Sequence, residues 1–197
     1  MIIGLSGAIN TGKDTVAAIL CEEYNFLNVA FADPLKDFCL KMFPDILDEE
    51  TLWGPSEKRT PECRRLLQQL GTDVARAFDT NVWIKHTVNR IRLLQDDGRD
   101  SLQRHTVPHR HCSIVVSDVR FPNEAQSIID LGGSIIQIVR PLNYDIVSTT
   151  DTARTHTSET SLSKIPHKFF AAHITNDKTL HDLETQTRRI LLGLLKT

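Results

Sequence analysis

The chain has 197 residues, of which 40% are hydrophobic, 24% charged and 6% aromatic. This length and composition fit one globular domain with a sizeable core, and they exclude a disordered chain. The 23 basic and 25 acidic residues leave a net charge of −2. A protein that coats nucleic-acid phosphates usually carries a basic excess, so we expect no nucleic-acid partner.

Cysteine usage and hydropathy constrain the compartment. None of the four cysteines forms a Cys-x-x-Cys pair, so we expect reduced thiols rather than a disulfide scaffold. The N-terminus has no basic region and too short an apolar run for a signal peptide. No stretch approaches the ~18 apolar residues of a membrane span. We therefore expect a cytoplasmic protein without a membrane partner.

Short apolar runs alternate with amphipathic segments along the chain. The runs predict five strands, at 2–5, 27–31, 113–117, 134–139 and 171–175. Helices are expected between them, from about Gly12, from Asp33-Pro34 with Asp33 as N-cap, from Thr60-Pro61, over about 82–95, over 124–131 and around 180–195. This alternation predicts an α/β fold with a parallel five-stranded sheet and helices on both faces.

Two long excursions, 33–112 and 141–168, interrupt the alternation. We interpret them as parts of a single domain over 1–197 rather than as separate domains. Long excursions at the strand ends of an open parallel sheet are where such folds build binding sites. We therefore expect the functional residues to gather at the carboxyl edge of the sheet.

The strongest motif is Gly7-Ala8-Ile9-Asn10-Thr11-Gly12-Lys13, which follows the first predicted strand and opens the first helix. Its glycines let backbone N–H groups point inward around a phosphate, and the helix N-terminus adds partial positive charge. Lys13 is placed to reach the β- and γ-phosphates of a nucleotide. The motif and its context predict a P-loop NTPase fold.

Two carboxylates near this loop have more than one interpretation. The position after Lys13 is normally a Ser or Thr that holds Mg²⁺, but here it is Asp14, followed by Thr15. Asp14 either helps to hold Mg²⁺ or turns away as a first-turn helix acid. Asp118 follows the third strand, where it fits a second Mg²⁺-associated acid, a substrate ligand or a turn cap.

Arginines distinguish the classes of P-loop protein further. At about 100° per residue, the helix from Pro61 carries one polar face, formed by Arg65, Gln69, Thr72 and Arg76. Its apolar side carries Leu66, Leu70, Val74, Ala77 and Phe78. The polar face is either solvated or a clamp for a second phosphate. Arg120 should lie at the sheet edge, and Arg154 lies in a segment that is either a closing lid or a surface loop.

Other motifs are weaker. No Asn-Lys-x-Asp sequence is present, since residues 175–178 have the wrong order, and this disfavours a guanine-nucleotide switch. A cluster of potential zinc ligands lies in the second half of the first excursion, at His105, His109, His111 and Cys112. No second ligand pair follows at finger spacing, so we prefer an exposed loop.

The sequence resembles the phage-type deoxynucleoside monophosphate kinases in several ordered blocks. The first runs from Gly4 through the phosphate loop to Val16. The others are Phe31-Ala32-Asp33-Pro34-Leu35-Lys36, Leu67-Gln68-Gln69-Leu70-Gly71-Thr72-Asp73 with Arg76 and Trp83, Asp118-Val119-Arg120-Phe121-Pro122-Asn123-Glu124, and His156-Thr157-Ser158-Glu159 after Arg140-Pro141. The blocks span most of the chain.

This resemblance implies ATP-dependent transfer of a phosphoryl group to a deoxynucleoside monophosphate. The excursion over 33–112 would hold the acceptor, and 141–168 would form the lid. ATP would be bound by Gly7, Asn10, Thr11, Gly12, Lys13, Asp14 and Thr15. The acceptor would be bound by Lys36, Arg65, Gly71, Thr72, Arg76, Trp83, Asp118, Arg120 and Glu124. Catalysis would use Lys13, Asp14, Arg120 and Arg154, with Mg²⁺ held by Asp14 and Asp118.

The chemistry requires little beyond positioning and charge. The acceptor phosphate has a second pKa near ~6, so it is mostly a dianion at neutral pH and needs no general base. The expected partners are therefore small molecules, ATP and a deoxynucleoside monophosphate, and a homodimer is left open. If the chain is phage-encoded, its compartment is the host cytoplasm.

Two rival functions remain at this stage. Another small-molecule P-loop kinase, of the phosphomevalonate or dephospho-coenzyme A type, would use the same loop. An acceptor without a base, such as phosphomevalonate, has no use for stacking by Trp83. A non-catalytic nucleotide-binding module would bind ATP without acceptor-dependent ADP release.

Overall fold

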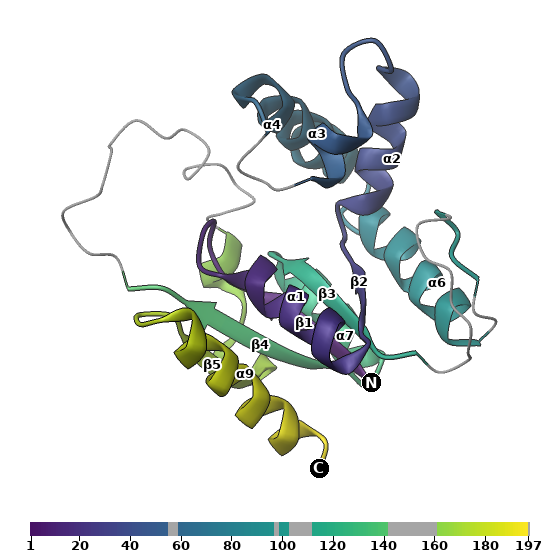
Figure 1. Cartoon of the computed structure of the whole chain (residues 1–197). Helices are drawn as coiled ribbons and strands as arrows, with labels where there is room; N and C mark the ends of the chain where they lie inside the picture. Colours follow the sequence, from purple (N-terminus) through teal and green to yellow (C-terminus); the bar gives the residue numbers. More distant parts are fainter. Residues whose placement is uncertain (55–58, 97–98, 103–111, 142–160, 197) are drawn as a thin grey trace.

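The computed structural model describes residues 1–54, 59–96, 99–102, 112–141 and 161–196, which Figure 1 draws in colour. The elements follow in the order β1 (Ile2–Ser6), α1 (Lys13–Tyr24), β2 (Leu27–Val29), α2 (Asp33–Met42), α3 (Glu49–Trp53), α4 (Pro61–Gln68), the π-helix η2 (Gln69–Ala75), α5 (Arg76–Phe78), α6 (Val82–Asp96), β3 (Ile114–Val119), α7 (Pro122–Asp130), β4 (Ser134–Val139), the 3₁₀-helices η5 (Ser161–Lys164) and η6 (His167–Phe169), β5 (Phe170–Thr175) and α9 (Leu180–Leu194).

The five strands form one parallel sheet, as the alternation predicted, and their order in the sheet is β2-β3-β1-β4-β5. β1 lies in the middle and pairs with β3 on one side and β4 on the other, with Gly4 opposite Val116 and Ile135. The carboxyl ends of β1 and β3 are therefore neighbours, and the loops that follow them open at the same edge.

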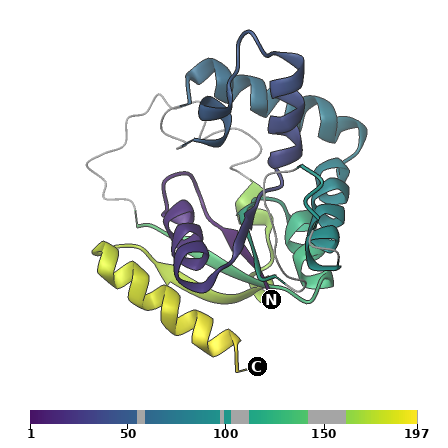
Figure 2. The ribbon, with the colours of Figure 1, turned by 45° about the vertical axis from the view of Figure 1, so that its right-hand side comes forward.

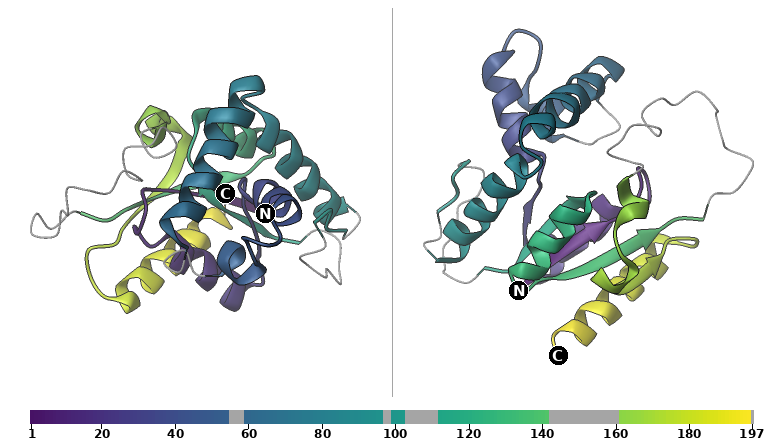
Figure 3. Two further views of the ribbon diagram at one scale, coloured as in Figure 1. Left: turned by 90° about the horizontal axis from the view of Figure 1, so that it is seen from above. Right: turned by 180° about the vertical axis from the view of Figure 1, so that it is seen from behind.

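Both faces of the sheet are covered, as predicted (Figures 2 and 3). On one face, α1 and α9 contribute Val16, Leu20 and Leu183 to a core with alternate strand residues. On the other face, α6 and α7 contribute Ile91 and Ile128, among others. Strands that are buried on both faces read as continuous apolar runs, which is why their positions were visible in the sequence. Within the described residues, none of the helices combines the length and apolar content needed to cross a bilayer.

The segment from α2 to α5, residues 33–78 without 55–58, forms a helical lobe above the carboxyl edge of the sheet (Figure 1). It has a core of its own, with Leu35, Cys39, Leu47, Leu52 and Cys63 buried together. Cys39 and Cys63 are free thiols, as expected from their spacing in the sequence. This part of the excursion is thus a small packed unit.

Three local predictions differ from the structure. β2 ends at Val29, two residues early, because the backbone N–H groups of Phe31 and Ala32 donate to Asp118 and not to a neighbouring strand. Ala32 occupies the N-cap position of α2, and Asp33 is the first helical residue. The Asp33 carboxylate accepts the Ala30 N–H at 2.9 Å, so it serves the preceding turn instead of the helix end.

The third difference concerns the helix that begins after Thr60. The Thr60 hydroxyl accepts the Cys63 N–H, so the predicted cap is confirmed. From Gln69, however, the helix widens into π-turns, each of which holds more residues than an α-turn. The α-helical register therefore fails, and Val74, Ala77 and Phe78 are exposed instead of buried. Phe78 is 91% exposed.

A buried ion network joins the helical lobe to α6. Arg90 is 1% exposed and donates from Nη1 to Asp33 Oδ2 at 2.7 Å. Its Nε and Nη2 donate to the two carboxylate oxygens of Asp100 at 2.7 and 3.0 Å. Because one cation neutralises two enclosed carboxylates, its removal leaves both without their countercharge.

We predict that Arg90→Ala lowers the free energy of unfolding by about 3–5 kcal/mol, the usual cost of breaking a buried ion pair from one side. Denaturant unfolding measures this change. Arg92 is exposed on the same helix, so Arg92→Ala should change stability by no more than about 0.5 kcal/mol. Similar stability of the two variants would contradict the role of the network.

Candidate active site

The loop between β1 and α1 is shaped by close backbone approach. A Cβ atom on Gly7 would lie 2.4 Å from the Ile138 carbonyl oxygen, which is too close for any side chain. Gly12 has φ +100°, a conformation that L side chains rarely adopt, and a Cβ there would meet the Asn176 amide at 2.6 Å. Both glycines of the motif are thus required by geometry.

Asn176 holds this loop from the other end of the chain. Its side-chain amide donates to the Thr11 carbonyl at 3.0 Å, and its backbone N–H donates to the Val139 carbonyl at 2.8 Å. The loop after β5 is therefore tied to the phosphate loop and to the end of β4. Sequence reasoning treated residues 175–178 only as a failed guanine motif and missed this contact.

Lys13 is the first side chain of α1 and is 7% exposed. Its ammonium donates to the Ala8 carbonyl at 2.6 Å, so the side chain folds back over the loop. Burial, together with a smaller effect of the Arg120 charge, lowers the pKa of Lys13 from 10.5 to about 8, against the opposing effects of Asp14 and Asp118. A phosphate anion in the loop would supply a charge partner for Lys13.

A cleft of about 860 Å³ lies between this loop and the helical lobe. Most of the sequence-predicted residues line it together: Asn10, Lys13, Asp14, Lys36, Gly71, Thr72, Arg76, Trp83, Asp118, Arg120 and Glu124. The remaining loop residues do not line it, and these are Gly7, Thr11, Gly12 and Thr15. Arg154, His156 and the zinc candidates His105, His109 and His111 lie outside the described residues, as does most of the 141–168 segment.

The arginines of the widened helix are placed differently from their prediction. Arg64 lines the cleft, whereas Arg65 is exposed and lies outside it. The π-turns of η2 take up extra residues, so Arg64, Gln68, Thr72 and Arg76, each four residues apart, all reach the cleft. The α-helical repeat had instead placed Arg65 on one face with Gln69, Thr72 and Arg76. The assignment of Arg65 to the acceptor site is therefore not supported.

Arg59 is a cleft residue that sequence reasoning missed. Its Nη2 donates to the Leu52 carbonyl at 2.8 Å, and its Nε donates to the Thr51 carbonyl at 3.4 Å, both at the end of α3. Burial lowers the pKa of Arg59, with further effects from charges that include Asp14 and Arg120. The helical lobe thus brings a cation to the phosphate loop. It lies in a polar, aperiodic stretch, so no local signal could have found it.

Asp118 acts on the backbone of the neighbouring turn. Its Oδ1 accepts the Phe31 N–H at 2.7 Å and its Oδ2 accepts the Ala32 N–H at 3.0 Å. Burial raises the pKa of the Asp118 carboxyl, while these hydrogen bonds lower it. Both oxygens are committed to the protein, which favours a positioning role over metal ligation.

Asp14 is the better match to a metal ligand. It is exposed and lines the cleft beside Lys13. Mg²⁺ in nucleotide sites is held by one or two carboxylates together with phosphate oxygens and water, so a single open carboxylate fits it. In the part of the chain that the structure describes, no group of three or more His, Cys, Asp or Glu residues could form a metal site by itself.

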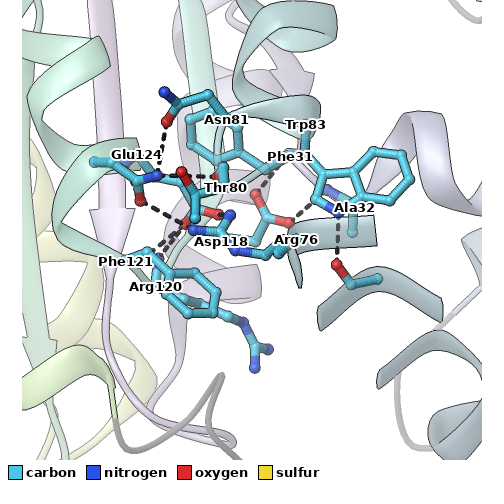
Figure 4. A network of polar contacts seen from close by, with 12 residues as sticks. Phe31, Ala32, Arg76, Thr80, Asn81, Trp83, Asp118, Arg120, Phe121 and Glu124 are labelled. Atoms are coloured by element: carbon cyan, nitrogen blue, oxygen red, sulfur yellow. Dashed lines mark hydrogen bonds and ion pairs between the residues drawn. The ribbon is translucent and has the colours of Figure 1, made fainter. Parts of the chain in front are cut away.

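Arg76 and Trp83 contact protein groups in this structure (Figure 4). The Trp83 indole N–H donates to the Gly71 carbonyl at 2.8 Å and so braces η2. Arg76 donates to Glu124 at 3.1 Å and to Asn123 at 3.0 Å. Burial raises the pKa of Glu124 to about 7, with a contribution from Asp118.

Comparisons with known proteins agree on one family. A family model described as "Deoxynucleotide monophosphate kinase" matches residues 55–187. A "Putative deoxynucleotide monophosphate kinase" of Acanthamoeba polyphaga mimivirus is 35% identical over 198 residues, which cover 94% of this chain and 93% of that protein.

Solved structures show the fold. Dephospho-CoA kinase from Campylobacter jejuni has a TM-score of 0.55 at 14% identity, with 99% of this chain and 97% of that chain covered. A gluconokinase from Sinorhizobium meliloti 1021 has a TM-score of 0.51 at 11% identity, with 98% and 91% covered. At these identities the likeness concerns the P-loop kinase fold alone.

The low pKa of Lys13 predicts how ATP affinity depends on pH. Bound phosphate raises the Lys13 pKa, so above about pH 8 binding must take up a proton that the free protein has lost. As far as Lys13 is concerned, we expect the affinity for ATP to be independent of pH below pH 8. At pH 9 it should be about tenfold weaker than at pH 7. Calorimetry in two buffers of different ionisation heat counts the protons. Equal affinities with no proton uptake would contradict the prediction.

Proposed function

This chain belongs to the deoxynucleotide monophosphate kinase family, and we propose that its cleft joins ATP·Mg²⁺ and a deoxynucleoside monophosphate over the phosphate loop. The observation that carries this proposal is a single continuous cleft, lined at one end by Lys13 and at the other by the helical lobe. The family assignment makes the protein a phosphotransferase with small-molecule substrates. The cleft provides the geometry for bringing two anionic phosphates together.

The cations that line the cleft support the binding of two phosphate-bearing substrates there. Lys13 comes from α1, Arg120 from the turn after β3, and Arg59 from the helical lobe, and all three line the same cavity. Burial lowers the pKa of Lys13 and of Arg59, and repulsion by the positive charge of Arg120 adds to this effect at both. A transferring phosphoryl group with oxygens on each side would relieve that repulsion and gain stabilisation as charge develops.

Asp14 would hold Mg²⁺ in this arrangement. Bound Mg²⁺ neutralises charge on the nucleotide phosphates and so reduces repulsion between donor and acceptor. Lys13 would replace its hydrogen bond to the Ala8 carbonyl with one to a phosphate oxygen. Asn176 would keep the loop in its present conformation through the hydrogen bond to Thr11. No residue needs to remove a proton, since the acceptor oxygen is already ionised.

Aromatic side chains favour a nucleoside as acceptor. Phe31, Trp53, Trp83 and Phe121 line the cleft. A base can stack on such rings, typically for about 1–3 kcal/mol. Because the fold likeness to dephospho-CoA kinase does not extend to sequence, it does not favour that acceptor over a nucleotide.

The function is tested by ADP release from ATP·Mg²⁺ with each of the four deoxynucleoside monophosphates, their ribo-counterparts and no acceptor. We expect release that depends on at least one deoxynucleotide. Lys13→Ala should reduce this turnover by on the order of 10²–10³-fold, the usual effect of removing one transition-state donor, without unfolding the protein. Acceptor-independent release, or normal turnover of folded Lys13→Ala, would contradict the proposal. Stimulation by phosphomevalonate or dephospho-coenzyme A alone would place the chain with the rival kinases.

Two neighbouring arginines test the register of the widened helix. Arg64→Ala should raise the KM for the acceptor by about 10- to 100-fold, as expected from the loss of about 1.5–3 kcal/mol in one charge-assisted contact. Arg59→Ala should lower kcat by a similar factor. Arg65→Ala is the matched control and should behave like the wild type, because its side chain lies outside the cleft. The reverse pattern at 64 and 65 would contradict the register.

A further inference from the structure

Glu124 is a buried carboxylate with three protein partners. It is 4% exposed, at the start of α7. Its Oε2 accepts the backbone N–H groups of Arg120 at 2.8 Å and Phe121 at 3.0 Å. Its Oε1 accepts Nη1 of Arg76 at 3.1 Å. Both oxygens are therefore engaged by the protein, from two separate parts of the chain.

Arg76 is held in place by this contact and by two others. Its guanidinium lies 3.7 Å from the centre of the Phe121 ring, and Nη2 donates to the Asn123 side chain at 3.0 Å. Asn123 in turn donates to the Thr80 carbonyl at 3.0 Å. The end of the helical lobe is thereby docked onto the turn between β3 and α7, and Glu124 contacts both (Figure 4).

The same turn carries Arg120. The Glu124 carboxylate fixes the Arg120 backbone, while in Figure 4 the Arg120 side chain extends away from that carboxylate. Arg120 lines the cleft, and its charge acts on Lys13 and Arg59. The conformation of the turn therefore decides where this cation stands relative to the phosphate loop.

We propose that Glu124 is a positioning residue for phosphoryl transfer: it aims Arg120 through the backbone of the turn and Arg76 through a buried ion pair. The inference rests on the proposed function, because it concerns how these cations meet the two phosphates. Glu124 itself need not touch the substrate. Its carboxylate contacts two elements that are distant in the sequence, since Arg76 precedes Arg120 by 44 residues.

The plain structural alternative is a helix cap. A Glu at the third helical position commonly accepts the N-cap N–H, and Gln serves there equally well. A capping role explains the contact with Phe121 but neither the burial of the charge nor the bond to Arg76. Enclosing a carboxylate costs free energy unless it is paired, and here the pairing comes from another element.

A double-mutant cycle separates the two roles. Steady-state kinetics would be measured with ATP and an accepted deoxynucleotide for the wild type, Glu124→Ala, Arg120→Ala and the double variant. If Glu124 acts through Arg120, each single change lowers kcat by about 10- to 100-fold, and the double variant lies within about twofold of Arg120→Ala. Multiplication of the two single effects would overturn the inference.

Glu124→Gln provides the second measurement. The amide oxygen can still accept the two N–H groups, but the charge that pairs with Arg76 is lost. We expect kcat within about threefold of the wild type and a KM for the acceptor raised about tenfold or more, the loss of roughly one ion pair. Wild-type values of both constants would leave only the cap and overturn the inference. If Glu124→Ala does not fold, this separation of KM from kcat decides.

Gln126→Ala is the matched control on α7. Gln126 is exposed and donates to Asp130 on the same helix, so its loss should leave kcat and KM unchanged. A wild-type protein that phosphorylates no deoxynucleotide would overturn the proposed function, and this inference with it. An active wild type with additive changes at Glu124 and Arg120 would overturn the inference alone.

Discussion

The Asp118 carboxylate sets where the helical lobe leaves the sheet. It accepts two consecutive backbone N–H groups at the end of β2, and so ties the beginning of α2 to the end of β3. The Arg90 network then fastens α2 to α6 from the opposite side. Because both anchors are buried or half-buried, the lobe is held over the phosphate loop, and the cleft between them is a consequence of these few contacts.

The cleft collects positive charge from elements that are distant in the sequence. Lys13, Arg59 and Arg120 come from three such elements. Burial disfavours the charged forms of Lys13 and Arg59, and repulsion by the charge of Arg120 adds to it. An anionic ligand in the cleft would offset part of this unfavourable energy. The lowered pKa of Lys13, caused first by burial and then by Arg120, gives ATP binding its expected pH dependence. The effect of Arg120 makes its placement by Glu124 consequential.

Much of the site could be predicted because its signals are local. The phosphate loop is a contiguous motif, and the strands are short apolar runs, so both were found with small errors at their ends. The register of the helix after Thr60 could not be predicted, because its π-turns change the number of residues per turn. Arg64 was missed because of this change of register. Arg59 was missed because the sequence around it shows no periodicity.

The sequence by itself determined the order of strands and helices, the phosphate loop and the family, since these depend on residues that are adjacent or regularly spaced. Only the tertiary structure decided which charges meet. Asn176 reaches Thr11, Arg90 reaches Asp33 and Glu124 reaches Arg76 across gaps of 165, 57 and 48 residues. Such contacts are selected by burial and charge pairing in the folded chain, and no local pattern records them.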